Sequence, residues 1–259
     1  MTRIGTLILA VALVAFAGGM VSAREWKSIR IATEGEYPPF NQLDAKDQPI
    51  GFDVDIAKAL CRKMAATCSF EVLDWDALIP SLNAGKVDAI VSSMSITPER
   101  EKTIDFTNKY YNTPPAIAVP KDSTITEATD EGLKGKTIGA QSSTTHANYA
   151  SAHLKDAELK LYPSPDEYKL DLANGRIDAV IDDVVVLSEW VKSDAGNCCK
   201  MLGTLKIDPE INGIGAGIGL RKGDTALKDK FNAAIAAIRA DGTYKKIQDK
   251  YFDFDVYGD

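Results

Sequence analysis

Residues that could carry out catalysis are sparse in this chain of 259 residues. It has two histidines, His146 and His153, and no Gly-x-Ser-x-Gly turn to hold a serine nucleophile. Gly213, Gly215 and Gly217 recur at every second position, which is the wrong spacing for a phosphate-binding loop. No His-x-x-x-His or Cys-x-x-Cys pair is present to bind a metal. The sequence therefore predicts no catalytic residue, no metal site and no cofactor.

Polar residues suited to binding a small zwitterion follow two predicted strands. Arginine can hold a carboxylate through two parallel N–H bonds, and a serine hydroxyl can donate to a carboxylate or accept from an ammonium group. An aspartate can pair with the ammonium group. After the strand predicted over 87–91 come Ser92, Ser93, Ser95 and Arg100, and after the strand predicted over 177–181 come Asp182 and Asp183.

A third polar segment, 141–145, precedes a predicted helix over 146–153. Its hydroxyl groups, and the free N–H groups at the start of that helix, suit a carboxylate. Each group also has a structural explanation: Arg100 as a surface ion pair, the serines as turn formers, and Thr144 and Thr145 as a helix N-cap. Taken together, at the ends of two similar strands, they favour a cleft built for an α-amino acid.

The elements that must position these groups alternate between strand and helix. Residues 29–33 predict a strand that ends before Gly35. Phe52, Ile56, Leu60 and Met64 recur every four positions and predict a helix. A strand over 70–73, a helix over 75–84 and a strand over 87–91 follow. This order predicts an α/β fold with parallel strands, whose ligands bind beyond the carboxyl ends of the strands.

An internal repeat extends this pattern to the second half of the chain. Residues 82–91 match residues 172–181, 90 positions later. Each copy contains a helix end, a glycine suited to the left-handed conformation, a basic residue and a buried strand. Residues 136–140 similarly correspond to residues 30–33. The two matches occur in the same order and predict two lobes of similar design.

The connections between these lobes are expected at two segments. Residues 113–115 contain two prolines, and residues 211–215 begin a glycine-rich run. With crossings there, lobe 1 comprises 24–112 and 216–259, and lobe 2 comprises 116–210. A helical stripe from Leu227 to Ile238 and a short final helix over 244–251 then belong to lobe 1.

The N-terminus predicts export. Residues 1–23 combine one basic residue, Arg3, with an apolar core and a small-residue cleavage site that ends at Ala23. The mature chain, starting at Arg24, has 29 basic and 37 acidic residues and a net charge of −8. This acidic balance argues against nucleic-acid binding. We expect a monomer in the periplasm.

The cysteine pattern agrees with an oxidising compartment. Cys61 and Cys68 are close enough in sequence to close a small disulfide loop, although two buried thiols are the alternative. Cys198 and Cys199 are adjacent, and the sequence leaves open whether they form a strained ring or remain free thiols.

Five segments together resemble one protein family, the bacterial periplasmic amino-acid-binding proteins of polar amino-acid ABC transporters. The lysine/arginine/ornithine- and histidine-binding members are the most similar, and the likeness covers essentially the whole mature chain. It implies a type II-like periplasmic binding protein with two lobes, each a parallel-rich sheet flanked by helices, joined by two crossing strands. It also implies a free amino acid as ligand, transient contact with an inner-membrane permease and its ATPase, and no catalysis. The segments are 37–40, 51–57, 76–82, 92–100 and 241–258.

The resemblance also implies roles for individual residues. Tyr37 and Trp75 correspond to aromatic walls of the side-chain slot, and Cys61 and Cys68 to a small disulfide loop of the family. Glu34 stands where binders of cationic amino acids have an aspartate, and Gln141 stands where they have a leucine. The residues expected to hold the α-ammonium and α-carboxylate groups are Ser92, Ser93, Ser95, Arg100, Thr145 and Asp183.

Glu34 and Gln141, which differ from the family pattern, lie where the family binds the side chain of the ligand. The resemblance therefore leaves several ligands as alternatives: arginine, ornithine, lysine, histidine or an opine derivative. Two other functions also stay open. One is a periplasmic enzyme on the same fold, similar to cyclohexadienyl dehydratase, which would need a general acid in the cleft. The other is a binding protein that presents its ligand to a chemoreceptor.

Overall fold

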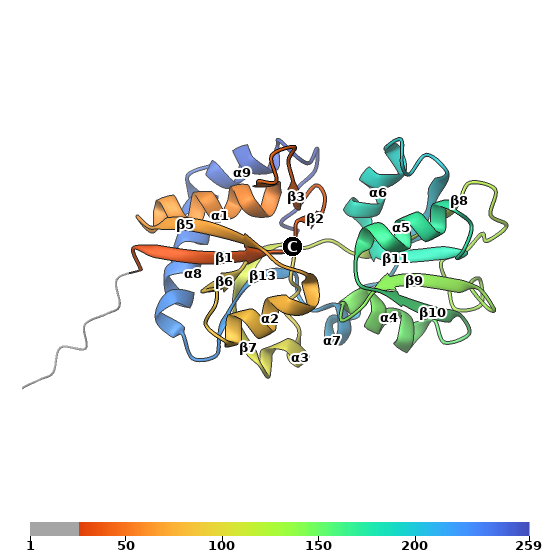
Figure 1. Cartoon of the computed structure of the whole chain (residues 1–259), viewed down its shortest axis with the longest axis horizontal. Helices are drawn as coiled ribbons and strands as arrows, with labels where there is room; N and C mark the ends of the chain where they lie inside the picture. The colour runs from red at the N-terminus through yellow and green to blue at the C-terminus, as the bar shows by residue number, and fades with distance from the viewer. Residues whose placement is uncertain (1–25, 259) are drawn as a thin grey trace, which may run out of the picture.

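The computed structural model describes residues 26–258. The predicted export signal, 1–23, lies outside the described residues. The described chain forms two lobes, each built on its own five-stranded sheet (Figure 1). The chain passes from the first lobe to the second and returns, so the C-terminal helices pack in the first lobe.

The first lobe contains a main sheet with the strand order β5-β1-β6-β13-β7. Strands β5, β1 and β6 run parallel, and β13 runs antiparallel to both of its neighbours. A small antiparallel sheet, β2-β3-β4, follows β1. The strands are β1 (Ser28–Thr33), β2 (Glu36–Tyr37), β3 (Asn41–Leu43), β4 (Pro49–Ile50), β5 (Thr67–Val72), β6 (Ala89–Ile90), β7 (Ile104–Tyr111) and β13 (Ala216–Arg221). The helices are α1 (Phe52–Lys63), α2 (Trp75–Asn83), α3 (Pro98–Glu101), α8 (Thr225–Ala240) and α9 (Thr243–Gln248).

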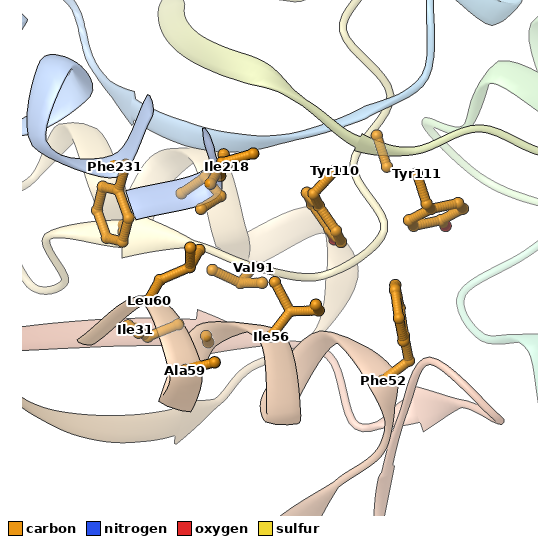
Figure 2. Packing of buried hydrophobic residues seen from close by; sticks show 14 of the residues in the cluster. Ile31, Phe52, Ile56, Ala59, Leu60, Val91, Tyr110, Tyr111, Ile218 and Phe231 are labelled. Carbon is orange, nitrogen blue, oxygen red and sulfur yellow. The ribbon is translucent and has the colours of Figure 1, made fainter. Parts of the chain in front are cut away.

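The larger of two hydrophobic clusters in the first lobe lies between this sheet and helices α1 and α8 (Figure 2), and the other includes Leu78 and Leu82 of α2. Ile56 and Leu60 of α1 and Phe231 of α8 pack against Ile31 of β1 and Ile218 of β13, and all five side chains are fully buried. The four-residue spacing of apolar residues predicted from the sequence is therefore the buried face of α1.

The second lobe has the strand order β10-β9-β11-β8-β12. Strands β10, β9 and β11 run parallel, whereas β8 runs antiparallel to β11 and β12. The strands are β8 (Pro115–Pro120), β9 (Thr137–Gln141), β10 (Glu158–Tyr162), β11 (Ala179–Asp183) and β12 (Cys199–Thr204). The helices are α4 (Thr145–His153), α5 (Pro165–Ala173), α6 (Val184–Lys192) and α7 (Pro209–Asn212).

The repeated segments occupy equivalent places in the two sheets. Ile31 of β1 pairs with Ala89 of β6, and Ile138 of β9 pairs with Ala179 of β11, in the same parallel register. The glycine in each copy of the repeat has a φ of 71° or 67°, the left-handed conformation that ends a helix. The two lobes therefore present the carboxyl ends of equivalent strands toward the space between them.

Two connections join the lobes, one between β7 and β8 and one between β12 and β13. Pro115, expected in the first crossing, is the first residue of β8, and residues 211 and 212, expected in the second, end helix α7 against α4. Gly213 and Gly215 have positive φ values of 77° and 121°, so the last strand begins only at Ala216. The exact lobe boundaries stay a prediction.

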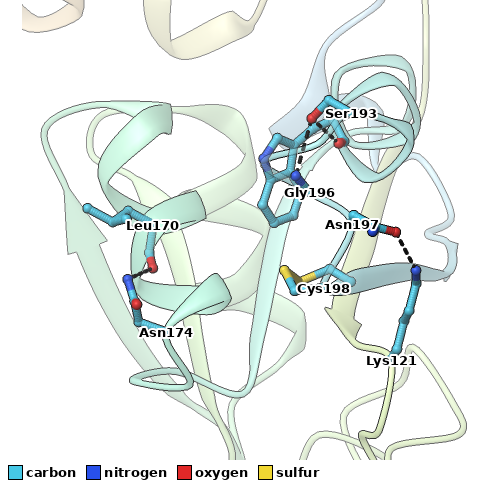
Figure 3. Close-up of a disulfide and its surroundings, with 9 residues drawn as sticks. Lys121, Leu170, Asn174, Ser193, Gly196, Asn197 and Cys198 are labelled. Carbon is cyan, nitrogen blue, oxygen red and sulfur yellow. Dashed lines mark hydrogen bonds between the residues drawn. A yellow bond between two sulfur atoms is a disulfide. The ribbon is translucent and has the colours of Figure 1, made fainter.

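Two disulfides are present in the described chain. The predicted bond between Cys61 and Cys68 is confirmed, with Cα atoms 6.2 Å apart, and it ties α1 to β5. The adjacent Cys198 and Cys199 are also bonded, at the start of β12 (Figure 3). Cys198 is exposed and Cys199 is buried.

Candidate ligand-binding site

A cavity lies between the two lobes, at the carboxyl ends of β1, β6, β9 and β11. It is lined by residues from both lobes, so closure of the lobes forms it. Eight of the nine predicted ligand-binding residues line it: Glu34, Tyr37, Trp75, Ser92, Ser93, Ser95, Arg100 and Thr145.

Arg100 supplies the strong cation of this cavity. Arg100 is the third residue of the short helix α3. Thr97 is the N-cap of this helix, and its hydroxyl accepts from the backbone N–H of Arg100 at 3.2 Å. Its guanidinium donates to the carbonyls of Ser95, at 3.0 Å, and Ser143, at 3.3 Å, and lies 5.2 Å from the ring centre of Trp75. Burial lowers its pKa to about 10, which leaves it charged at neutral pH. Within residues 26–258 no carboxylate forms an ion pair with it, so its charge is available to an anionic ligand group.

The serines after β6 have different roles. The Ser92 hydroxyl accepts from the backbone N–H of Glu34 at 2.9 Å, and the Ser93 hydroxyl donates to buried Asp53 at 2.9 Å. Ser93 has a φ of 53°, an uncommon left-handed conformation for a residue with a side chain. Both hydroxyls therefore fix the loop, whereas the hydroxyl of Ser95 has no bond to another group in the described chain.

Glu34 gives the same cavity a buried carboxylate. Glu34 is 6% exposed, and its Oε1 accepts from Nε2 of Gln141 at 2.5 Å. Burial raises the pKa of Glu34 to about 7, with smaller raising effects from Glu36 and Asp182, while Gln141 and Lys169 act in the lowering direction. A cationic ligand group placed here would favour the ionised carboxylate.

The second lobe contributes the start of helix α4. The Thr144 hydroxyl accepts from the backbone N–H of Ala147 at 3.1 Å, so Thr144 is the N-cap. Thr145 is the first helical residue and lines the cavity. Thr144 therefore acts as the helix N-cap, which was the structural explanation for this threonine pair. Thr145 instead lines the cavity, where a ligand can contact it.

Asp183 does not line the main cavity. It lines an adjoining cavity toward the crossings, which shares Tyr37, Ser93, Ser95, Thr145 and His146 with the main one. Its carboxylate accepts from the hydroxyl of Thr113 and, at 2.7 Å, from the backbone N–H of Val185 at the start of α6. Burial raises its pKa to about 7, partly offset by the Thr113 bond.

Asp182 and His146 also line the main cavity; the sequence pointed to Asp182 only as a possible ammonium partner beside Asp183, and His146 was not predicted as a site residue. The Asp182 carboxylate accepts from the hydroxyls of Tyr168 and, at 2.5 Å, Tyr37, and lies 3.2 Å from Nδ1 of His146. Burial lowers the pKa of His146, so the ring favours its neutral form. In the sequence, the place of these two residues is indicated by their neighbours, because Asp182 directly precedes Asp183 and His146 directly follows Thr145.

Several hydrogen bonds cross from one lobe to the other around the cavity. Tyr37 bonds Asp182, Gln141 bonds Glu34, and the indole N–H of Trp75 donates to the carbonyl of Ser143 at 3.2 Å. The aromatic residues Tyr37 and Trp75 are thus held in place by the opposite lobe. The described residues contain no helix long and apolar enough to cross a membrane, and residues 26–258 contain no cluster of three or more metal-ligating side chains.

Comparison with known proteins agrees with this architecture. Residues 29–254 match the family model described as bacterial extracellular solute-binding proteins, family 3. The chain is 47% identical over 235 residues to the L-arginine-binding protein of Pseudomonas aeruginosa, with 90% of each chain covered. It is 43% identical over 235 residues to the histidine-binding periplasmic protein of Escherichia coli, again with 90% of each covered.

Solved structures of similar proteins share the fold. An ancestral arginine-binding protein bound to arginine has a TM-score of 0.81 and 35% sequence identity, with 87% of this chain and 98% of that chain covered. The prediction of a two-lobed periplasmic binding protein is therefore confirmed. On the family match and these likenesses, the chain belongs to family 3 of the bacterial extracellular solute-binding proteins.

Proposed function

We propose that this protein captures a cationic α-amino acid in the periplasm by closing its lobes and delivers it to an inner-membrane ABC permease. The observation that carries the proposal is the pairing of opposite charges along one cavity. The guanidinium of Arg100 lines the cavity without a carboxylate partner in the described chain, and the buried carboxylate of Glu34 lines the same cavity. An amino acid with a basic side chain carries the complementary charges, an α-carboxylate for Arg100 and a side-chain cation for Glu34.

The α-carboxylate is assigned to Arg100, with the Ser95 hydroxyl and the start of α4 at Thr145 as further donors. Arginine forms two parallel bonds to a carboxylate, and the N-terminal end of a helix favours negative charge. Ser92 and Ser93 contribute mainly by fixing the loop that carries Ser95.

The α-ammonium group is assigned to Asp183, which faces the adjoining cavity beside Ser93 and Thr145. Its carboxylate is already held by Thr113 and by the start of α6, so it is positioned before a ligand arrives. A cation between the lobes would offset the cost of its burial.

The side-chain cation is assigned to Glu34, between the rings of Tyr37 and Trp75. Relatives named for binding arginine and histidine support a basic ligand. Because the relatives are binding proteins rather than enzymes, we assign no reaction to this cavity. Cleavage after Ala23 would release a monomer that contacts the permease and its ATPase transiently.

The test is a ligand screen. The mature protein, purified and stripped of ligand by unfolding and refolding, is heated with each L-amino acid, and hits are measured by calorimetry. Arginine, lysine, ornithine or histidine should give the largest stabilisation, and aspartate and glutamate none. Preference for an acidic or aliphatic amino acid would overturn the cationic assignment, and conversion of a hit to product would overturn the assignment as a pure binding protein.

A further inference from the structure

Asp53 is a fully buried carboxylate that lines neither of the two cavities. It is the second residue of α1, and within the described chain its side chain accepts hydrogen bonds from three neutral groups. Burial raises its pKa to about 6, and the three bonds act against that rise. A carboxylate is costly to bury, so these bonds are what keep it ionised at neutral pH.

The three donors come from three different segments of the first lobe. Nδ2 of Asn41, on β3, and the hydroxyl of Ser93, in the loop after β6, each lie 2.9 Å from Oδ2 of Asp53. The hydroxyl of Tyr110, on β7, lies 2.8 Å from Oδ1. One carboxylate therefore fixes two strands and a loop relative to the start of α1, through bonds that a charged acceptor strengthens.

One branch of this network holds Ser93 at two of its atoms. The Ser93 hydroxyl donates to Asp53 directly, and the Ser93 backbone N–H donates at 3.2 Å to the Tyr110 hydroxyl, which in turn donates to Asp53. Ser93 has a φ of 53°, a conformation that a residue with a side chain keeps only where its surroundings fix it. Two residues further on, the carbonyl of Ser95 accepts from the guanidinium of Arg100 at 3.0 Å. The turn at Ser93 thus leads directly into the segment that holds this guanidinium.

The other branch reaches Glu34. Asn41, whose amide N–H donates to Asp53, accepts through Oδ1 from the backbone N–H of Gly35 at 2.8 Å. Gly35 directly follows Glu34 and has a φ of 84°. The backbone N–H of Glu34 donates to the hydroxyl of Ser92 at 2.9 Å, so the two loops also meet there. All of these bonds lie within the first lobe and do not depend on closure.

We propose that Asp53 is a positioning residue that holds the turns at Ser93 and Gly35 in their left-handed conformations. These turns present Arg100 and Glu34 to the ligand before the lobes close. Binding then does not have to order the two loops, which raises affinity. The identity of the ligand rests on the proposed function, whereas the two turns are a property of the unliganded protein.

The first test needs no ligand. Amide hydrogen exchange of Gly35 and Ser93 is followed by NMR in the unliganded wild type, Asp53→Asn and Asp55→Asn. Asp53→Asn keeps the shape of the side chain and removes its charge, so both amides should exchange about tenfold faster relative to the amides of β1. Asp55→Asn is the matched control, because it makes the same change in the same turn of α1 and its bonds run to the segment after α9. Unchanged exchange in Asp53→Asn, or an equal acceleration in the control, overturns the proposal.

The second test measures arginine affinity by calorimetry in a double-mutant cycle. Asp53→Asn should lower affinity about tenfold when Ser93 is present. In the Ser93→Gly background the loss should be much smaller, because glycine adopts the left-handed conformation unaided. Asp55→Asn should lower the free energy of unfolding and keep its affinity. If Asp53→Asn lowers the free energy of unfolding and leaves affinity unchanged, or if the loss is equal in both backgrounds, the proposal is overturned.

Tyr110→Phe is a second variant, for the case in which Asp53→Asn does not fold. It leaves the carboxylate in place and removes the hydroxyl that joins the Ser93 N–H to it. It should speed exchange of the Ser93 amide and lower arginine affinity, and wild-type values for both overturn the proposal. A wild type that binds no cationic amino acid overturns the proposed function, while the exchange rates still decide the role of Asp53.

Discussion

Glu34 and Gln141 occupy equivalent positions in the two lobes and are hydrogen bonded to each other across the cavity, with Gln141 Nε2 2.5 Å from Glu34 Oε1. Glu34 lies three residues after Ile31 and Gln141 three residues after Ile138, and these isoleucines pair in the same register of their sheets. The repeat thus brings a carboxylate and an amide together where the sequence resemblance places a carboxylate and a leucine. One oxygen of Glu34 remains for a ligand cation, and the amide fixes its direction.

The bond between Tyr37 and Asp182 predicts a specific effect on closure. Tyr37→Phe keeps the aromatic wall and removes a bond that joins the lobes. A hydrogen bond to a charged group contributes about 1.5 kcal/mol or more, so ligand affinity should fall roughly tenfold. Tyr168→Phe is the matched control, because it removes a donor to the same carboxylate from within one lobe. It should lower the free energy of unfolding and change affinity much less; calorimetry showing equal affinity losses would contradict the assignment.

The elements of the fold were predictable where they repeat a local pattern. The period-four apolar residues of α1 and the 90-residue repeat each depend on neighbours in sequence, and both are confirmed. Helix α7 was missed because four residues are too few to show a period. The predicted strand over 87–91 narrows to β6, Ala89–Ile90, because only that part pairs with β1 and β13.

The site was predictable only in part for the same reason. Arg100 and Glu34 follow strand ends, which the sequence marks. The role of Asp182 depends on Tyr37, 145 residues away, and on Tyr168, so nothing local distinguishes it from Asp183. Ser93 lines the cavity, and its hydroxyl also donates to Asp53, a contact that only the packed lobe creates.

Arg100 should be the principal clamp for the ligand carboxylate. Removing one partner of a buried charge pair costs about 2–5 kcal/mol, which corresponds to a loss of roughly 30- to 4,000-fold in affinity. Arg100→Lys should recover only part of this, since an ammonium cannot form the parallel pair of bonds. Arg62→Ala, an exposed arginine in the last turn of α1, is the control and should bind normally. Calorimetry that finds wild-type affinity for Arg100→Ala would rule out the clamp.

The Cys61–Cys68 bond should stabilise the first lobe without affecting ligand contacts. A loop with a sequence separation of 7 contributes about 2 kcal/mol by the chain-entropy argument. The double variant Cys61→Ser/Cys68→Ser should lower the free energy of unfolding by about this amount, measured by urea denaturation, and retain its affinity. Mass spectrometry of non-reduced peptides provides the direct check. Alkylation of both cysteines without prior reduction would show that the two thiols are free and that the bond is absent.

The stability of the unliganded protein should respond to pH through Glu34. Its pKa is about 7 in the folded state against an ordinary 4.5, so the folded protein binds a proton that the unfolded chain releases between these values. This raised pKa therefore lowers the free energy of unfolding as pH rises from about 4.5 to 7. Glu34→Gln removes the effect, so its stability relative to wild type should increase across that window, by up to about 3 kcal/mol.

Urea denaturation of both proteins from pH 4.5 to 7.5 measures this difference directly. The contributions of His146, Asp53 and Asp183 are common to both proteins and cancel. Glu127→Gln, which neutralises an exposed carboxylate of the second lobe that does not act on the pKa of Glu34, should show no such trend. A difference between Glu34→Gln and wild type that stays constant with pH would mean that Glu34 titrates normally in the folded protein.

Glu34→Gln should also change the ranking of ligands, because it removes the carboxylate that the side-chain cation meets and keeps the shape of the cavity. Arginine should lose far more affinity than citrulline, which has the same length and no charge. The reason is that a buried carboxylate attracts a cation strongly and an amide does not. Glu127→Gln is the matched control, since Glu127 is exposed, outside the main cavity and without an effect on the pKa of Glu34. Competition calorimetry gives both affinities for each protein. If the ratio of arginine to citrulline affinity is the same in Glu34→Gln as in wild type, Glu34 does not read the ligand side chain, and the selectivity must come from Asp182 or from the aromatic walls.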